Sequence, residues 1–330
     1  MKKAKKKGFK SRSPVSLKIK RKLNALEKDL KSMLEGADSE VRQSYMQTIT
    51  AGGKRIRPAI VFLCSQFAAA DEANVRKAAA SVELIHAASL IHDDIMDGAR
   101  LRRGMPTVYS KWGSQVALRI GDYLFAQAFL LLNETGHFEA VTVLSSAVKQ
   151  LSEGEIEQIK SAFDTNQALS YYLLKIRCKT ASLFRASAEL GAIFGNAPKS
   201  TVKALGGFAE NLGMAFQVYD DILDINAEEE VLGKSLGTDL RDGTLTLPIL
   251  YALKETKSRR LADIFTSEKC SETEIKEGLQ IILASTAVEK ARVQAGKFVD
   301  KALKGLETVD NERLKKELKA ICEYTIERYN

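Results

Sequence analysis

The chain has 330 residues, of which 45% are hydrophobic and 28% charged, and this balance excludes a mainly disordered protein. It has no run of 18 apolar residues, which argues against a membrane-spanning helix. Its four cysteines, at positions 64, 178, 270 and 322, are too scattered for a zinc site or a disulfide framework.

The net charge of +8 arises from the N-terminus, because residues 1–22 hold eleven Lys and Arg and no acid. The remainder has 39 basic and 42 acidic residues, a net charge of −3. We therefore expect a basic, disordered arm over 1–22 and a single folded domain over 23–330. The arm has no apolar core of a secretory signal, so we expect a cytoplasmic protein, with an organelle transit peptide as the alternative. The arm could make weak contact with an anionic membrane surface, and no nucleic-acid partner is expected.

Apolar periodicity predicts helices almost throughout, and no strand–helix alternation is present. Pro58 suits the first turn of one helix, which we expect to run to Ala68, and Gly98 suits the end of another. The helix before Gly98 is apolar nearly all round, which is typical of a helix inside a large domain. The other expected helices cover 39–50, 75–97, 116–133, 138–163, 169–194, 202–225 and several segments between 247 and 328.

Two segments carry the acidic pattern DDxxD near the end of an apolar helix, one from Asp93 to Asp97 and one from Asp220 to Asp224. On a helix the first and last acids of each pattern share a face. Like charges at that spacing repel by roughly 0.2–0.5 kcal/mol, and the negative end of the helix dipole disfavours them further. A bound cation would relieve this repulsion.

Oxygen ligands without a neighbouring Cys or His set favour Mg²⁺ over zinc or copper. Protein-bound Mg²⁺ commonly completes its coordination with water and substrate phosphates, so the two motifs predict a phosphate-bearing substrate. A solvated acidic helix face is the alternative for one motif alone, and two copies make it the weaker interpretation.

Basic residues lie close to these motifs in the sequence. The segment GGKRIRP, at 52–58, places Lys54 and Arg57 at a spacing that can clamp an anion beside two glycines. Arginine forks suit phosphate groups. The further basic candidates are Arg100, Arg102, Arg103, Lys179 and Lys234. Carboxylates for metal ions together with anion clamps describe a site that binds and ionises diphosphates.

Eight motifs occur in a characteristic order: GGKRIRP (52–58), ELIHAASLIHDDIMD (83–97), LRRG (101–104), GD (121–122), GEIEQ (154–158), KTASLF (179–184), FQVYDDILD (216–224) and GKSLGTDLRDGTLTLP (233–248). From about Leu30 onward the chain resembles the trans-isoprenyl (polyprenyl) diphosphate synthases of the medium- to long-chain type. The resemblance implies an isoprenoid synthase fold, a large all-α barrel around a deep apolar cavity, usually as a homodimer. It also implies Mg²⁺-dependent, head-to-tail transfer of an allylic diphosphate's prenyl group to isopentenyl diphosphate.

The resemblance assigns roles to matching residues. Isopentenyl diphosphate would be held by Lys54, Arg57, His86 and Arg103. Two or three Mg²⁺ ions would be bound by Asp93, Asp97 and Asp220, with support from Asp94, Asp221 and Asp224. The allylic diphosphate would be contacted by Arg102, Lys179, Thr180, Gln217 and Lys234. Thr244 departs from the pattern, because many members carry Lys there.

The residues before the first acidic motif predict a long product, of C30 or longer. Short-chain members place Phe or Tyr four or five residues before the first Asp, where this chain has Ser89 and Ala88. Small residues there leave the path of the growing tail open. The alternatives are a short-chain farnesyl or geranylgeranyl diphosphate synthase, the catalytic subunit of a heteromeric synthase, and, less favoured, a class I terpene cyclase.

Overall fold

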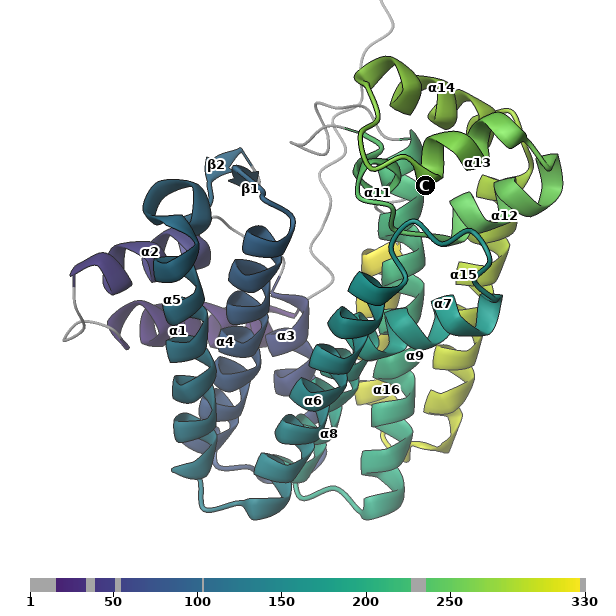
Figure 1. Cartoon of the computed structure of the whole chain (residues 1–330). Coiled ribbons are helices and arrows are strands. Elements are labelled where there is room, and N and C mark those ends of the chain that lie inside the picture. Colours follow the sequence, from purple (N-terminus) through teal and green to yellow (C-terminus); the bar gives the residue numbers. More distant parts are fainter. Residues whose placement is uncertain (1–15, 34–38, 51–54, 103, 227–235, 327–330) are drawn as a thin grey trace, which may run out of the picture.

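The computed structural model describes residues 16–33, 39–50, 55–102, 104–226 and 236–326, and helices make up most of them (Figure 1). The helices are α1 (Leu17–Ser32), α2 (Ser39–Thr50), α3 (Ile56–Cys64), α4 (Glu72–Met96), α5 (Val108–Asn133), α6 (Phe138–Lys160), α7 (Leu169–Ile176), η1 (Arg177–Ala181), α8 (Ser182–Phe194), α9 (Lys199–Asn226), α11 (Thr238–Arg241), α12 (Leu247–Thr256), α13 (Arg259–Thr266), α14 (Glu272–Leu283), α15 (Ala287–Gly305), η2 (Leu306–Thr308) and α16 (Glu312–Ile326). The expected all-α architecture is confirmed.

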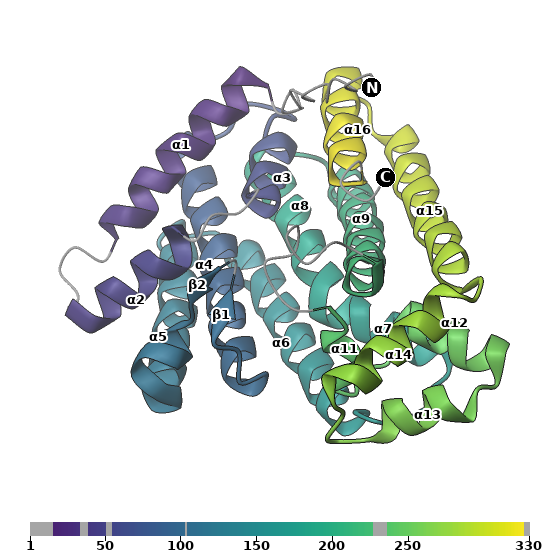
Figure 2. The same ribbon diagram turned by 90° about the horizontal axis from the view of Figure 1, so that it is seen from above.

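Helix α8 lies at the centre of the arrangement (Figure 2). It packs against α3, α4, α6 and α9, while α4 also packs along α5, and α9 along α15. Eleven residues of α8 are buried, and thirteen residues of α4 are buried, as the apolar sequence of α4 predicts. Two apolar clusters form the core, and α9 contributes to both, with Leu212 in one and Met214 in the other.

The expected arm and helix α1 overlap. Helix α1 begins at Leu17, Ile19 is fully buried, and Lys22 forms an ion pair of 2.8 Å with Glu72. Apolar side chains at helical spacing, including Leu26, explain why this segment folds onto the core. The expectation of a disordered arm is therefore wrong for residues 17–22, and residues 1–15 lie outside the described part of the chain.

Local hydrogen bonds determine where the helices end. Gly98 follows the C-cap residue Asp97 of α4 and has a φ of +59°, as its predicted place at the helix end requires. Helix α3 ends at Cys64 rather than at Ala68, because the Ser65 hydroxyl donates to the Phe62 carbonyl and the Ala68 N–H bonds to the Gly195 carbonyl. The chain thereby turns away from the helix axis.

Three further expectations need correction. Helix α6 ends at Lys160, before Phe163, because Phe163 has a φ of +62° and its N–H bonds to the Gly243 carbonyl. Helix α5 begins at Val108, with a break at Gly113, where φ is +82°. The helix expected over 169–194 contains the π-helical turn η1, and π-turns are frequent at functional sites.

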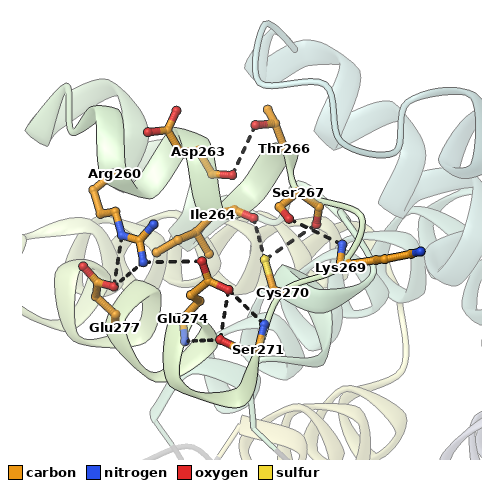
Figure 3. Close-up of polar contacts among 10 residues, drawn as sticks. All are labelled: Arg260, Asp263, Ile264, Thr266, Ser267, Lys269, Cys270, Ser271, Glu274 and Glu277. Atoms are coloured by element: carbon orange, nitrogen blue, oxygen red, sulfur yellow. Dashed lines mark hydrogen bonds and ion pairs between the residues drawn. The ribbon is translucent and has the colours of Figure 1, made fainter.

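A short hairpin follows α4, where the sequence predicts only a loop. Strands β1 (Leu101–Arg102) and β2 (Met105–Pro106) pair antiparallel, and Gly104 turns between them with a φ of +75°. Between α12 and α15, polar contacts join α13 to α14 (Figure 3). Arg260 pairs with Glu277 at 2.7 Å, and Ser271 caps the start of α14.

Candidate active site

A cavity of about 520 Å³ opens between the helices that carry the acidic motifs. Its walls come from α2, α3, α4, β1, α6, η1, α8 and α9. The predicted site residues that line it are Arg57, His86, Ser89, Asp93, Arg102, Lys179, Thr180, Gln217 and Asp220. Residues far apart in the sequence therefore meet in one space, as the motif analysis predicts.

A second, smaller cavity of about 150 Å³ adjoins the first and shares Lys179, Thr180 and Gln217 with it. It adds Asp97 and Asp221 from the two acidic motifs. Three predicted site residues, Lys54, Arg103 and Lys234, lie outside the described residues.

The middle acid of the first motif positions an arginine. Asp94 is 4% exposed, and its carboxylate accepts a 2.7 Å hydrogen bond from Nε of Arg102 on the hairpin. Burial raises the pKa of Asp94, and the Arg102 guanidinium opposes that shift. Asp93 and Asp97 are left to face the cavities, while Arg102 is directed toward the larger one.

The second motif is held by a hydrogen-bonded network. Asp221 accepts hydrogen bonds from Tyr172 Oη at 2.6 Å and Gln217 Nε2 at 2.9 Å. The Thr180 hydroxyl in turn donates to Gln217 Oε1 at 2.6 Å. Burial raises the pKa of Asp221 to about 6, although both hydrogen bonds oppose the shift. The network fixes the amide and the hydroxyl that face the cavity.

The last acid of the second motif positions the chain that follows it. Asp224 is 3% exposed, and its carboxylate accepts a 3.1 Å hydrogen bond from the backbone N–H of Asp239 in α11. Asp224 therefore holds α11 in place without lining either cavity itself.

The motif residues that we singled out omit one side chain, Glu155 in GEIEQ. Its carboxylate accepts a 2.9 Å hydrogen bond from Lys179 Nζ and lines the larger cavity. Burial raises the pKa of Glu155 to about 7, and Lys179 opposes the shift. Gly154 permits this contact, because a Cβ there would lie 2.8 Å from the Lys179 backbone nitrogen. In the sequence, only its place in the GEIEQ motif indicated that Glu155 belongs to the site.

The basic segment divides into a structural arginine and an arginine that faces the cavity. Arg55 pairs with Glu27 and Glu83 and donates to a backbone carbonyl, so its charge is neutralised within the fold. Arg57 stacks on the Phe184 ring at 4.6 Å, and its Nε has no hydrogen-bond partner among the described residues. Burial lowers the pKa of Arg57 to about 10. A cationic group with a free donor in a cavity is suited to an anionic ligand.

The two predicted chain-length residues differ in environment. Ser89 lines the larger cavity, and its hydroxyl donates to the His86 carbonyl at 2.9 Å. Ala88 is fully buried in the core beside this wall and is not one of the residues that line the cavity.

The acids face the cavities without forming a ready-made metal cluster. Among the described residues, no three His, Cys, Asp or Glu side chains are placed to hold a metal ion by themselves. Burial alone would lower the pKa of Lys179, but Asp93, Glu155 and Asp97 raise it above the ordinary value. Their negative field therefore converges on one region, where a cation and an anionic ligand could bind together.

Comparisons with known proteins agree with this geometry. The polyprenyl synthetase family model matches residues 38–282. Heptaprenyl diphosphate synthase component 2 of Geobacillus stearothermophilus is 40% identical over 284 residues, covering 85% of this chain and 88% of that protein. Nonaprenyl diphosphate synthase of Mycobacterium tuberculosis is 35% identical and covers 90% and 89% of the two chains.

The fold also matches solved structures. The polyprenyl synthase of Caulobacter crescentus, solved in complex with calcium and isoprenyl diphosphate, superposes with a TM-score of 0.91 at 31% identity, covering 96% of this chain and 98% of that one. The resemblance seen in the motifs is confirmed. The chain therefore belongs to the polyprenyl synthetase family, in its medium- to long-chain branch, and is a prenyltransferase.

Proposed function

We propose that the enzyme joins isopentenyl diphosphate to an allylic diphosphate, head to tail, with release of pyrophosphate. The observation that carries this proposal is the placement of Asp93 and Asp220, on α4 and α9, in one cavity with Arg57 and Lys179. The oxygen-only donors fit Mg²⁺. The lack of a preformed cluster among the described residues fits a metal whose coordination is completed by substrate phosphates.

Bound Mg²⁺ would neutralise the charge that develops on the departing diphosphate. Asp93, Asp97 and Asp220 would hold it, with Lys179 and Arg102 as the cations on the same diphosphate. Thr180 and Gln217 line both cavities. We place their fixed oxygens near the cationic carbon left when the allylic C–O bond breaks.

The second substrate would bind at Arg57 and His86. There the isopentenyl double bond would attack the allylic carbon, and a proton would then be lost to the pyrophosphate. Phe184 and Phe216 give this part of the cavity apolar walls, which would limit attack by water.

Two substitutions test the metal assignment. Asp93→Ala and Asp220→Ala should each lower turnover by orders of magnitude while leaving helical circular dichroism unchanged. Normal turnover in both variants would overturn the assignment, and Asp300→Ala, at an exposed residue of α15, serves as the control.

We propose a product of C30 or longer, supported by the small side chain of Ser89 on the cavity wall. Ser89→Phe should shorten the main product to C15–C20 while isopentenyl incorporation stays substantial. Ala88→Phe should also shorten it if the growing tail opens a path between α4 and α5. Unchanged chain length in both folded variants would refute this path.

We propose that the enzyme acts as a cytoplasmic homodimer. Exposed apolar side chains along α5 and at the start of α6 support a second copy as the partner: Leu118, Tyr123, Leu130 and Phe138. By length and composition alone α5 could also cross a membrane, but it packs along α4. The double variant Leu118→Glu, Leu130→Glu should halve the mass measured by light scattering, whereas Leu283→Glu on α14 should not. A wild-type monomer would contradict the homodimer.

A heteromer is the second candidate, because the Geobacillus relative is named as one component of a synthase. Turnover by the purified chain alone would argue against a required partner.

A further inference from the structure

A buried lysine lies beside the diphosphate-binding residues and has no role in the mechanism above. Lys175 is on α7, and its residue is 5% exposed. Its Nζ donates a 3.3 Å hydrogen bond to the carbonyl oxygen of Leu245, a neutral partner. Burying an ammonium group is costly unless an anion or several hydrogen bonds compensate it.

The space around this ammonium belongs to the smaller cavity. Lys175 lines that cavity together with Asp97 and Lys179, which we assign to the metal ions and the diphosphate. Thr246 lines it too; it is 3% exposed, and its hydroxyl has no hydrogen-bond partner among the described residues. Buried polar groups normally have partners, so an under-satisfied lysine and an orphan hydroxyl in one cavity indicate a ligand.

Two carboxylates act on the Lys175 ammonium through their charge and not through a hydrogen bond. Burial lowers the pKa of Lys175, while the carboxylates of Asp221 and Asp239 oppose the shift. Asp221 already accepts hydrogen bonds from Tyr172 and Gln217, and Asp239 lines the cavity. A purely structural lysine would be expected to bond to one of these carboxylates rather than to a carbonyl.

We propose that the Lys175 ammonium binds the diphosphate group held between α4 and α9, as a cation additional to Lys179. This rests on the proposed function of the site. The ligand chemistry is a metal-complexed diphosphate, which could belong to the allylic substrate or to the released pyrophosphate. Thr244, next to Leu245, lines the same cavity with an uncharged side chain, so Lys175 would supply positive charge that the neighbouring loop lacks.

The test compares Lys175→Gln and Lys175→Met with wild type. Glutamine can keep the hydrogen bond to Leu245 but carries no charge. Lys175→Gln therefore still tests the charge if the methionine variant does not fold. KM is measured for farnesyl diphosphate and for isopentenyl diphosphate, with the inhibition constant of inorganic pyrophosphate under Mg²⁺. Lys22→Met, at a half-buried lysine on α1, is the matched control.

Loss of a charge-assisted contact should raise the farnesyl KM, the pyrophosphate inhibition constant, or both, by about ten-fold or more. A rise in the farnesyl KM would show that Lys175 binds the allylic substrate, and a rise in the inhibition constant would show that it binds the released pyrophosphate. The isopentenyl KM should stay within about two-fold, and Lys175→Gln, Thr244→Lys should recover part of the loss. A purely structural lysine would not be rescued from position 244.

Folded variants in which neither value changes, or in which both substrates weaken equally, would overturn the proposal. Wild-type turnover tests the proposed function separately. If wild type transfers no prenyl group, the lysine is still tested by the rise in Tm that pyrophosphate with Mg²⁺ causes. This rise should be smaller in Lys175→Gln than in wild type, and an equal rise would overturn the proposal.

Discussion

Replacing Phe184 with leucine should weaken binding of isopentenyl diphosphate. The ring of Phe184 lies 4.6 Å from the Arg57 guanidinium and 5.5 Å from the ring of Phe216. Leucine keeps an apolar side chain there but removes the face on which the guanidinium rests. A cation–π contact contributes about 0.5–2 kcal/mol, which corresponds to a rise of roughly two- to thirty-fold in the isopentenyl KM if Arg57 loses its orientation.

The assay separates this effect from lost stability. Phe208→Leu, at a fully buried ring on α9, is the matched control. Both variants should lose less unfolding free energy than the about 3–5 kcal/mol typical of Phe→Ala, and only Phe184→Leu should raise the isopentenyl KM. The KM of the allylic substrate should change little. An unchanged isopentenyl KM in folded Phe184→Leu would show that the ring does not orient Arg57.

Three other substitutions test the fold and the site. Gly154→Ala should lower the unfolding free energy by about 1–3 kcal/mol, because the added Cβ would lie 2.8 Å from a backbone nitrogen. Gly207→Ala is the control and should not destabilise the protein, because no atom lies within 4 Å of the added Cβ. Equal effects of the two substitutions in chemical denaturation would contradict this. Asp94→Asn should raise the allylic KM about two- to ten-fold by releasing Arg102, and steady-state kinetics that match wild type would contradict it. Hydrogen bonds from the side chain and the backbone of Thr286 lower the pKa of Glu255 from 4.5 to about 2. The ionised Glu255 carboxylate therefore stabilises the folded protein above pH 4.5, and this contribution is lost as the pH falls toward 2. Glu255→Gln should therefore lower the Tm at pH 7 by more than at pH 3, and a pH-independent difference would contradict the linkage.

The sequence was most informative where one physical rule dominates. The all-round apolar pattern before Gly98 predicted a buried helix, and the paired acids predicted two oxygen clusters facing one site. The early end of α3 was not predictable, because it depends on a hydrogen bond from Ala68 to Gly195, which only the fold brings near. The hairpin at Leu101–Arg102 was missed because its two strands have two residues each, too few to show an alternating pattern. The same holds for residues 17–22, whose charge pattern suggested solvent while Ile19 packs into the core.

Within the site, the sequence identified the candidate residues, but it did not show which of them face the cavity and which only support the fold. Arg55 and Arg57 are two residues apart, but Arg55 is neutralised by two carboxylates while Arg57 faces the cavity. Glu155 lies in a motif that the sequence shows, but its role, like that of Lys175, depends on its partner: a lysine for Glu155 and a backbone carbonyl for Lys175, each from a distant segment. Pair contacts of this kind carry no local periodicity.

The most direct test of the central claim incubates the purified protein with labelled isopentenyl diphosphate, farnesyl diphosphate and Mg²⁺, followed by chromatography of the products. We expect label in polyprenyl diphosphates of C30 or longer, and none when the metal is chelated. Release of a hydrocarbon or alcohol from farnesyl diphosphate, with no label incorporated, would contradict the proposed reaction.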